Sequence, residues 1–229
     1  MKTHLPIVLV LALCIQFSRG EERSPLNKFE GEIKAFEETD KKSPPPQQAI
    51  LFVGASGIKL WKTLKKDFPE HQVINRGFGG SQIADAIHFA DRIVIPYKPK
   101  TILLQSGGND INAGKSPEQV AEDFRIFVER VRGKLPEVRI LFMSLQPSPA
   151  RWTQAEKQKR TNALIRKQVE SGKNMAYIDA YDAFLTADGK PREELFVADK
   201  LHHNEAGYKI RTALVMPFLK GQEKSPKKP

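Results

Sequence analysis

The chain has 229 residues, of which 40% are hydrophobic, and a formal net charge of +10 from 37 basic and 27 acidic side chains. This balance is too apolar for a disordered chain and too charged for a multi-span membrane protein, so it predicts a globular protein with one large or two small domains. The single cysteine, Cys14, excludes a disulfide framework, an iron–sulfur cluster and a cysteine-based zinc site in the main body of the chain.

Residues 1–20 have the pattern of a secretory signal peptide. A short positive start precedes the mostly apolar stretch from Leu5 to Phe17, and residues 18–20 place small residues at the −3 and −1 positions of a cleavage site. The apolar stretch is short for a membrane span, although an uncleaved membrane anchor is the alternative. We therefore expect a secreted or periplasmic protein with no stable membrane insertion after signal cleavage.

The segments that flank the central part of the chain differ in character. Residues 21–48 predict an N-terminal helix and a proline-rich connector, because Phe29, Ile33 and Phe36 recur at helical spacing and three consecutive prolines follow. Residues 221–229 form a lysine-rich end, which predicts a solvated disordered tail rather than an anion-binding arm. No aromatic residue interleaves its lysines, so nothing there favours a nucleic-acid partner.

Residues 49–220 predict a single domain in which strands and helices alternate. We expect strands at 50–53, 72–75, 101–104, 138–143 and 175–178, and helices at 58–66, 81–93, 117–133, 155–171 and 205–219. This alternation predicts an α/β fold, with a parallel sheet covered by helices on both faces. Such sheets carry their working groups beyond the carboxyl ends of the strands, and small polar residues gather after the first three strands, at 54–57, 77–81 and 107–110.

The glycine-rich loops do not match nucleotide-binding motifs. The run that begins at Gly77 opens like a dinucleotide fingerprint, but Gln82 stands at its third glycine position. The full phosphate-binding loop, a glycine followed five positions later by Gly-Lys and Ser/Thr, does not occur in the sequence. A G-x-S-x-G nucleophile motif is absent as well, because Ile58 replaces its second glycine.

A hydrolytic site fits these loops better. Ser56 follows the first strand at a turn that can expose its hydroxyl, but an alcohol needs a base to act as a nucleophile. His202 is the histidine with a carboxylate placed to orient it, Asp199, three residues earlier. Backbone N–H groups of glycine loops and an asparagine amide can stabilise the oxyanion. Taken singly, a serine in the position of Ser56 is more often a helix N-cap than a nucleophile, and Asp199 could cap the turn before the last helix.

Taken together, these residues resemble the SGNH hydrolases, also called GDSL-type esterases and lipases. Four blocks follow in the family's order: Gly54-Ala55-Ser56, Gly80, Asn109, and Asp199-Lys200-Leu201-His202. The resemblance covers residues 50–219, and its third and last blocks are the most specific. It implies a three-layer, flavodoxin-like fold with a five-stranded parallel sheet, ester hydrolysis through an acyl-enzyme, and no metal or cofactor.

The resemblance also assigns a role to each matching residue. It implies that Ser56 is the nucleophile, that His202 is the base and later the acid, and that Asp199 orients the imidazole. It further implies an oxyanion hole formed by Ser56, Gly80 and Asn109. The first block departs from the name-giving Gly-Asp-Ser-Leu, with Ala55 and Gly57 at the second and fourth positions, neither of which contributes a reacting atom.

Three further residues are candidates for the substrate wall. Arg151 and Trp152 follow the fourth strand in a loop that should face the same edge of the sheet, and Arg151 could attract an anionic or hydroxyl-rich substrate. His203 adjoins the proposed base, but adjacent side chains diverge, so we expect it at the rim of the site or on the surface.

The expected function is that of a secreted serine esterase acting on acyl esters, short-chain or acetyl, on carbohydrates. This substrate class is inferred from the substrates that the family hydrolyses and from the expected location outside the cytoplasm. A lipase or lysophospholipase is an alternative, although the sequence has no large apolar lid insertion. A catalytically inactive relative that binds glycans through the same cleft is the alternative outside the enzymes.

Overall fold

The computed structural model describes residues 26–220. The predicted signal peptide at 1–20 and the predicted basic tail at 221–229 lie outside the described residues. Across residues 26–220, no helix has both the length and the apolar character needed to cross a bilayer.

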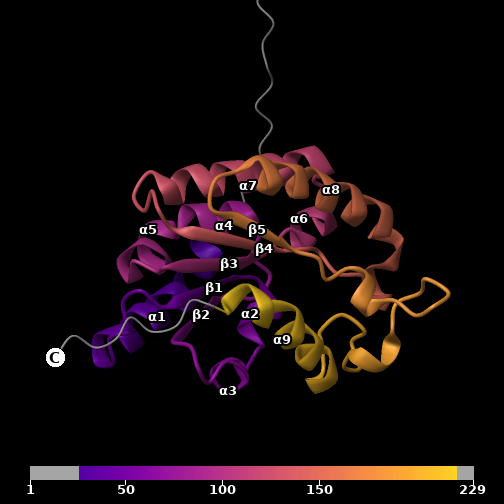
Figure 1. Ribbon diagram of the computed structural model, residues 1–229, viewed down its shortest axis with the longest axis horizontal. Coiled ribbons are helices and arrows are strands. Elements are labelled where there is room, and N and C mark those ends of the chain that lie inside the picture. Colours follow the sequence, from indigo (N-terminus) through magenta and orange to yellow (C-terminus); the bar gives the residue numbers. More distant parts are fainter. Residues whose placement is uncertain (1–25, 221–229) are drawn as a thin grey trace, which may run out of the picture.

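Five parallel strands form the central sheet (Figure 1). They are β1 (Ile50–Gly54), β2 (Val73–Gly77), β3 (Thr101–Gln105), β4 (Arg139–Met143) and β5 (Met175–Ile178). Their order, β2-β1-β3-β4-β5, is that of flavodoxin-like folds, so the predicted fold class is confirmed. Gly54 is level with both Gly77 and Gln105, so the carboxyl ends of β1, β2 and β3 lie at one edge of the sheet.

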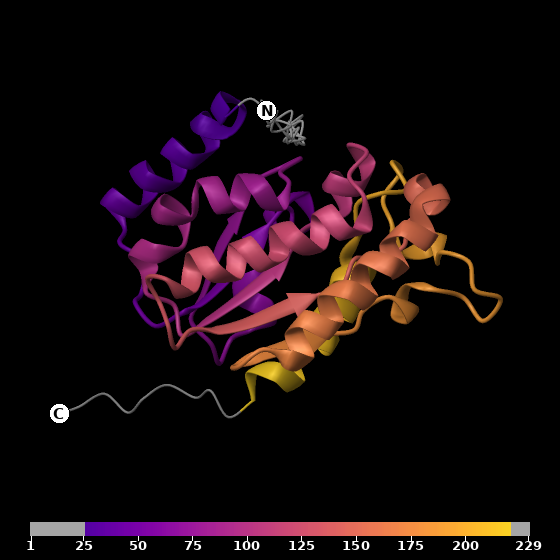
Figure 2. The ribbon, with the colours of Figure 1, turned by 90° about the horizontal axis from the view of Figure 1, so that it is seen from above.

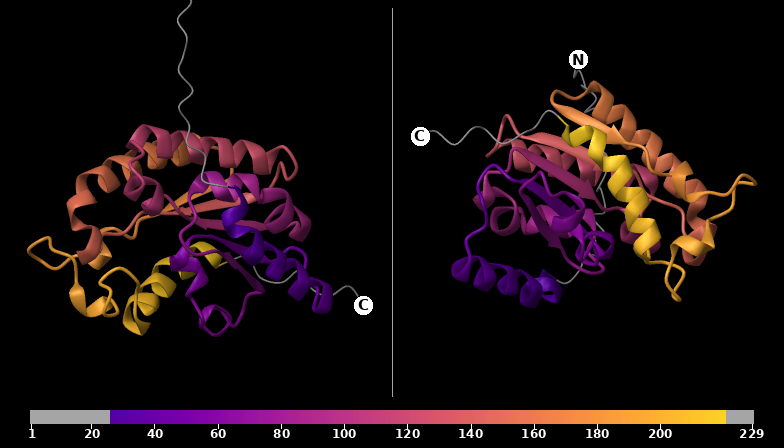
Figure 3. Two further views of the ribbon diagram at one scale, coloured as in Figure 1. Left: turned by 180° about the vertical axis from the view of Figure 1, so that it is seen from behind. Right: turned by 60° about the horizontal axis from the view of Figure 1, so that its bottom comes forward.

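Helices cover both faces of the sheet (Figures 1 and 3). One face carries α4 (Ile83–His88), α5 (Ala90–Ile93), α6 (Gly108–Asn112), α7 (Pro117–Arg132) and α8 (Ala155–Ser171), and the other carries α2 (Ser56–Lys59), α3 (Leu64–Asp67) and α9 (Glu205–Leu219). Short 3-10 helices lie at Leu26–Phe29, Ile95–Tyr97, Pro149–Gln154, Asp182–Phe184 and Glu193–Leu195.

The two halves of the core follow from the alternation of side chains along the strands. In β1, Leu51 and Val53 pack with α4 and α7, whereas Ile50 and Phe52 pack with α2, α3 and α9. Successive strand residues point to opposite faces, so a strand covered on both sides reads as a continuous apolar run. This is why the short runs in the sequence predicted the strands well.

Two predicted helices are each divided in the structure. Residues 58–66 do not form one helix, because the chain leaves α2 before Trp61 and α3 begins only at Leu64. The Trp61 ring is 1% exposed, and its Nε1–H donates to the Asp67 carboxylate at 2.6 Å. Residues 81–93 are likewise divided at Phe89, which is 2% exposed. Burying each large ring outweighs the few helical hydrogen bonds that are lost.

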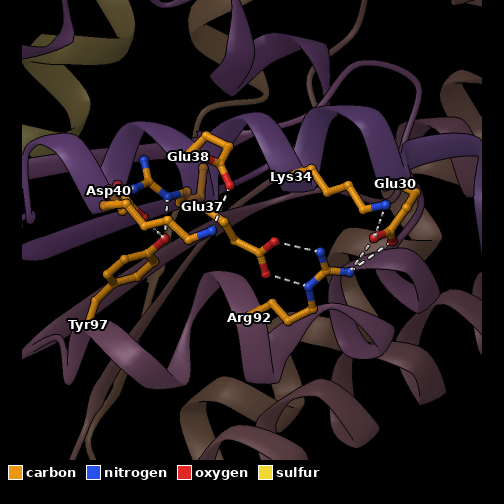
Figure 4. A network of polar contacts seen from close by, with 9 residues as sticks. Glu30, Lys34, Glu37, Glu38, Asp40, Arg92 and Tyr97 are labelled. Carbon is orange, nitrogen blue, oxygen red and sulfur yellow. Dashed lines mark hydrogen bonds and ion pairs between the residues drawn. The ribbon is translucent and has the colours of Figure 1, made fainter.

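The N-terminal helix α1 (Glu30–Lys42) runs along the edge of the domain, away from α8 (Figure 2). Its apolar stripe faces the α4–α5 side of the core, where Phe29 and Ile33 are 2% and 0% exposed. Polar contacts to α5 border this apolar stripe (Figure 4). Arg92 of α5 pairs with Glu30 at 2.8 Å and with Glu37 at 2.6 Å. Apolar packing and the salt bridges of Arg92 thus hold the helix against the domain.

Candidate active site

Ser56 stands at the sharp turn between β1 and α2. β1 ends at Gly54, whose φ is +156°, and a Cβ at that position would lie 2.1 Å from the Gln105 carbonyl oxygen of β3. Only glycine permits this close approach of the two backbones. β1 and β3 flank the point where the strand order reverses, which is where flavodoxin-like sheets bind their ligands.

The structure brings Ser56, His202 and Asp199 into one chain of hydrogen bonds. The Oγ atom of Ser56 lies 2.8 Å from Nε2 of His202. On the other side of the ring, Nδ1 of His202 lies 2.6 Å from Oδ2 of Asp199. These residues come from the β1–α2 turn and from the loop before α9, 146 positions apart in the sequence. The arrangement can pass a hydroxyl proton from the serine to the imidazole.

The carboxylate of Asp199 is held in its ionised form. Its Oδ1 accepts the backbone N–H groups of Leu201 and His202, each at 2.9 Å. The N–H of His202, its imidazole and the N–H of Leu201 together lower the pKa of Asp199 to about 2. An ionised Asp199 accepts the Nδ1 proton, and this tautomer leaves Nε2 free to accept the Ser56 proton.

Asn109 lies at the start of α6 with both ends of its amide held. Its Nδ2 donates to the carbonyl oxygen of Ser81 at 2.9 Å, and its Oδ1 accepts from Nη2 of Arg151 at 3.0 Å. The amide N–H₂ group is therefore turned toward the loop that contains Gly80. In the described part of the chain, the N–H groups of Ser56 and Gly80 have no acceptor, so they are available to a ligand.

Asp110 joins the loops that follow β2 and β3, a role that the sequence does not predict. It is 0% exposed, and its carboxylate accepts the backbone N–H of Ile83 at 3.2 Å. Burial raises its pKa to about 6, opposed by Lys115 at 3.1 Å. The contact across the two loops sets the distance between Asn109 and the loop of Gly80.

A small cavity of about 90 Å³ opens beside Ser56 and His202. Its walls come from the carboxyl ends of β1, β3 and β4 and from the region of α9, and they include Gln105, Ser106, Gln146 and Ser148. The cavity is thus small, and polar side chains form much of its wall.

The three candidates for the substrate wall are placed differently. Arg151 lines the cavity. Trp152 is not among the lining residues, and its ring centre lies 5.9 Å from Nζ of Lys190. His203 lines the cavity, as expected of a residue at the rim of the site, and is partly buried, with its ring stacked on Phe184 at 4.5 Å between ring centres. Burial, with the charges of Arg211 and His202, holds the pKa of His203 well below its usual range, so this imidazole is neutral.

Residues 54–210, more than half of the chain, match the model of the GDSL-like lipase/acylhydrolase family. The chain belongs to this family. It is therefore an ester-hydrolysing enzyme, as the resemblance in the sequence predicts.

Relatives and solved structures agree with this family. The chain is 26% identical over 182 residues to platelet-activating factor acetylhydrolase IB subunit alpha1 of Bos taurus, covering 74% of this chain and 73% of the relative. Its fold resembles a GDSL-like lipase of Bacteroides thetaiotaomicron, with a TM-score of 0.70, 17% identity, and 83% and 98% of the two chains covered. It also resembles a family 3 carbohydrate esterase of Talaromyces cellulolyticus, with a TM-score of 0.60, 18% identity, and 74% and 95% covered.

The departure from the Gly-Asp-Ser-Leu pattern of the GDSL-like family has a structural reason at Gly57. A Cβ there would lie 3.1 Å from Nη1 of Arg211 and 2.8 Å from Oε1 of Gln105. Arg211 projects from α9, is 0% exposed, and donates from Nη1 to the Gly57 carbonyl oxygen at 2.8 Å. A distant arginine thus supports the nucleophile turn where the family pattern has a bulky side chain.

Sequence reasoning missed Arg211, because 154 positions separate it from Gly57 and no motif marks it. It also missed the contact through which Arg151 holds Asn109. Among the described residues, no group of three or more His, Cys, Asp or Glu side chains is arranged to hold a metal ion.

Proposed function

We propose that the protein is a secreted serine esterase that removes short acyl groups, acetyl above all, from carbohydrate esters. The observation that carries the proposal is the hydrogen-bonded chain of Ser56, His202 and Asp199 at the mouth of the small cavity. Secretion is supported by the signal-peptide pattern of residues 1–20.

Catalysis begins when Oγ of Ser56 attacks the ester carbonyl carbon while its proton passes to Nε2 of His202. The carbonyl oxygen becomes an oxyanion, and the N–H groups of Ser56, Gly80 and the Asn109 amide donate to it. The imidazolium, held by Asp199, then gives its proton to the leaving alcohol. An acyl-serine remains, and water activated by His202 hydrolyses it to the free acid and restores the serine.

The size and lining of the cavity support a short acyl group. A volume of about 90 Å³ favours a short acyl group over a long one, and the polar part of the wall gains little from contact with methylene groups. The acetylhydrolase of Bos taurus and the carbohydrate esterase of Talaromyces cellulolyticus are similar to this chain, and these likenesses support acetyl esters of carbohydrates as substrates.

A series of esters with one alcohol and growing acyl chains tests this substrate class. We expect kcat/KM for 4-nitrophenyl acetate to exceed that for the octanoate by about tenfold or more, because small pockets discriminate by at least that factor per misfitting methylene. Acetylated oligosaccharides should release acetate under the same conditions. A kcat/KM that rises with chain length would instead support the lipase alternative, and glycan binding without turnover would support the inactive relative.

Replacing Asn109 with alanine is expected to lower kcat by about 10²–10³-fold with little change in KM, because an oxyanion donor binds the transition state more strongly than the ester carbonyl. Steady-state kinetics with the acetate ester measure the change. Asn112→Ala, an exposed asparagine on the same helix, is the matched control. If the two variants lose activity equally, Asn109 is not an oxyanion donor.

A further inference from the structure

The cavity beside Ser56 has an unbalanced charge. Two arginines, Arg151 and Arg211, are among its lining residues, and no aspartate or glutamate is. Asp199, the carboxylate of the triad, already accepts hydrogen bonds from the imidazole and the backbone N–H of His202. The neutral His203 adds no further charge to the cavity. Among the described residues, the cavity is therefore a cationic site with no carboxylate in its walls.

Two arginines that contact α1, Arg76 and Arg92, are neutralised by carboxylates. Figure 4 shows Arg92 between Glu30 and Glu37, each within hydrogen-bond distance. By contrast, the polar contacts of Arg151 and Arg211 among the described residues are with amide and carbonyl oxygens. An uncompensated charge in a desolvated place is costly and is retained where it binds or stabilises an anion.

Arg151 is the arginine that a substrate can reach. It is partly exposed and is carried by the 3-10 helix that follows β4. Its Nη2 holds Asn109 at 3.0 Å, and its remaining guanidinium N–H groups have no acceptor among the described residues. Desolvation lowers its pKa, but an arginine stays protonated at neutral pH. Its free donors therefore lie beside the proposed oxyanion site.

Arg211 is buried beneath the cavity, so it can influence a bound substrate through its positive charge and not by direct contact. It is 0% exposed, and Trp61 and Tyr208 flank its guanidinium, with ring centres at 4.8 and 5.5 Å. Burial lowers its pKa to about 10, so the group is still charged at neutral pH. In this low-dielectric surrounding its positive potential extends into the cavity and adds to that of Arg151.

We propose that the enzyme selects esters that carry a carboxylate or phosphate group close to the scissile bond, with Arg151 as the group that contacts this anion. The proposal rests on the esterase function proposed above and adds the charge of the substrate. A planar guanidinium matches both anions with two parallel hydrogen bonds. Two sources supply this chemistry: an acetylated uronic acid carries a carboxylate, and an acetylated sugar or glycerol phosphate carries a phosphate.

Matched pairs of acetyl esters test the proposal. One pair compares an acetylated neutral sugar with the corresponding uronic acid, and the other compares an acetylated glycerol with its phosphate. We expect wild-type kcat/KM to favour the charged member of at least one pair by about tenfold or more at low salt, and less at high salt. The pair with the larger ratio identifies the source of the anion.

Arg151 could act by binding the anion or only by holding Asn109. The ratio of kcat/KM for the charged ester to kcat/KM for the neutral ester separates these two roles, because only anion binding changes it. Arg151→Gln removes the charge but keeps an amide donor, and it should bring the ratio near one whatever happens to kcat. Arg151→Lys should keep part of the preference. Arg160→Gln removes an exposed arginine of α8 that pairs with Glu118 and should leave the ratio unchanged. Inorganic phosphate should inhibit the wild type competitively, and the Arg151→Gln variant several-fold less.

The outcomes distinguish this proposal from the esterase function. If the wild type hydrolyses the neutral acetates and shows no preference in either pair, the anion proposal is overturned and the esterase function stands. An equal preference in wild type and folded Arg151→Gln also overturns it. If no ester is hydrolysed, both proposals fail. Thermal unfolding of each variant checks that Arg151→Gln is folded.

Discussion

Ser56→Ala is expected to lower kcat for the acetate ester by about 10⁶-fold, the loss typical of serine enzymes without their nucleophile. In the native site Oγ lies 2.8 Å from the base, His202, and alanine leaves no atom to attack the carbonyl or to give up a proton. Binding should persist, because the cavity walls and the proposed oxyanion donors remain. Initial rates at high enzyme concentration, with a blank for spontaneous hydrolysis, measure the loss.

Covalent labelling gives a second measurement of the same prediction. An organophosphate such as diethyl 4-nitrophenyl phosphate should add one diethylphosphoryl group to the wild type, seen as a mass increase on the peptide that contains Ser56. Ser56→Ala should stay unlabelled. Ser171→Ala, which removes an exposed serine at the end of α8, should be labelled and active like the wild type. Wild-type rates in Ser56→Ala would remove Ser56 from the mechanism.

Asp199→Asn is expected to lower kcat by about 10⁴-fold, as in other sites where a carboxylate orients the catalytic histidine. The amide keeps an oxygen for the N–H groups of Leu201 and His202, so the loop should retain its shape. It cannot, however, accept the Nδ1 proton and stabilise the imidazolium as a carboxylate does at 2.6 Å. The histidine is then held in a tautomer that cannot accept the serine proton.

The pKa of Asp199 adds a pH dependence to this prediction. Its backbone and imidazole donors lower the pKa to about 2, and a carboxylate is ionised above its pKa. The orienting charge is therefore present at every pH above about 3 and is lost only as the pH falls toward 2. Any loss of wild-type activity between pH 5 and 8 then belongs to another group.

Profiles of kcat/KM against pH for wild type and Asp199→Asn check this expectation. The deficit of the variant should be of similar size across that range. Asp182→Asn, which alters an exposed carboxylate in the region after β5, is the control for the loss of a negative charge. A deficit below about tenfold would show that Asp199 does not orient the base.

Much of the fold could be predicted from local sequence patterns. The helices at 155–171 and 205–219 and the strand at 175–178 have the predicted bounds, because the spacing of their apolar residues is encoded within each segment. The divided helices at 58–66 and 81–93 could not be predicted. Whether Trp61 and Phe89 turn into the core depends on the space that other elements leave for them.

The residues of the proposed triad could be predicted from four short blocks in a known order, but the contacts around them could not. Asp110 directly follows the third of these blocks, Asn109, yet its role in joining two loops appears only when α6 is folded against the loop after β2. Arg211 belongs to no block, and its contact with Gly57 spans 154 positions. Pairings of this kind depend on how α9 crosses the sheet.

The sequence by itself determined the family, the strand–helix alternation and the positions of Ser56, His202 and Asp199, because these are read from local spacing and from motifs with a fixed order. Only the tertiary structure decided the size of the cavity and its uncompensated charge from Arg151 and Arg211. The physical reason is that the burial of a side chain and its pairing with a counter-ion are properties of the folded chain. The sequence does not show whether an arginine will be desolvated or paired. A guanidinium produces a strong local positive potential only where folding removes water and places no carboxylate beside it.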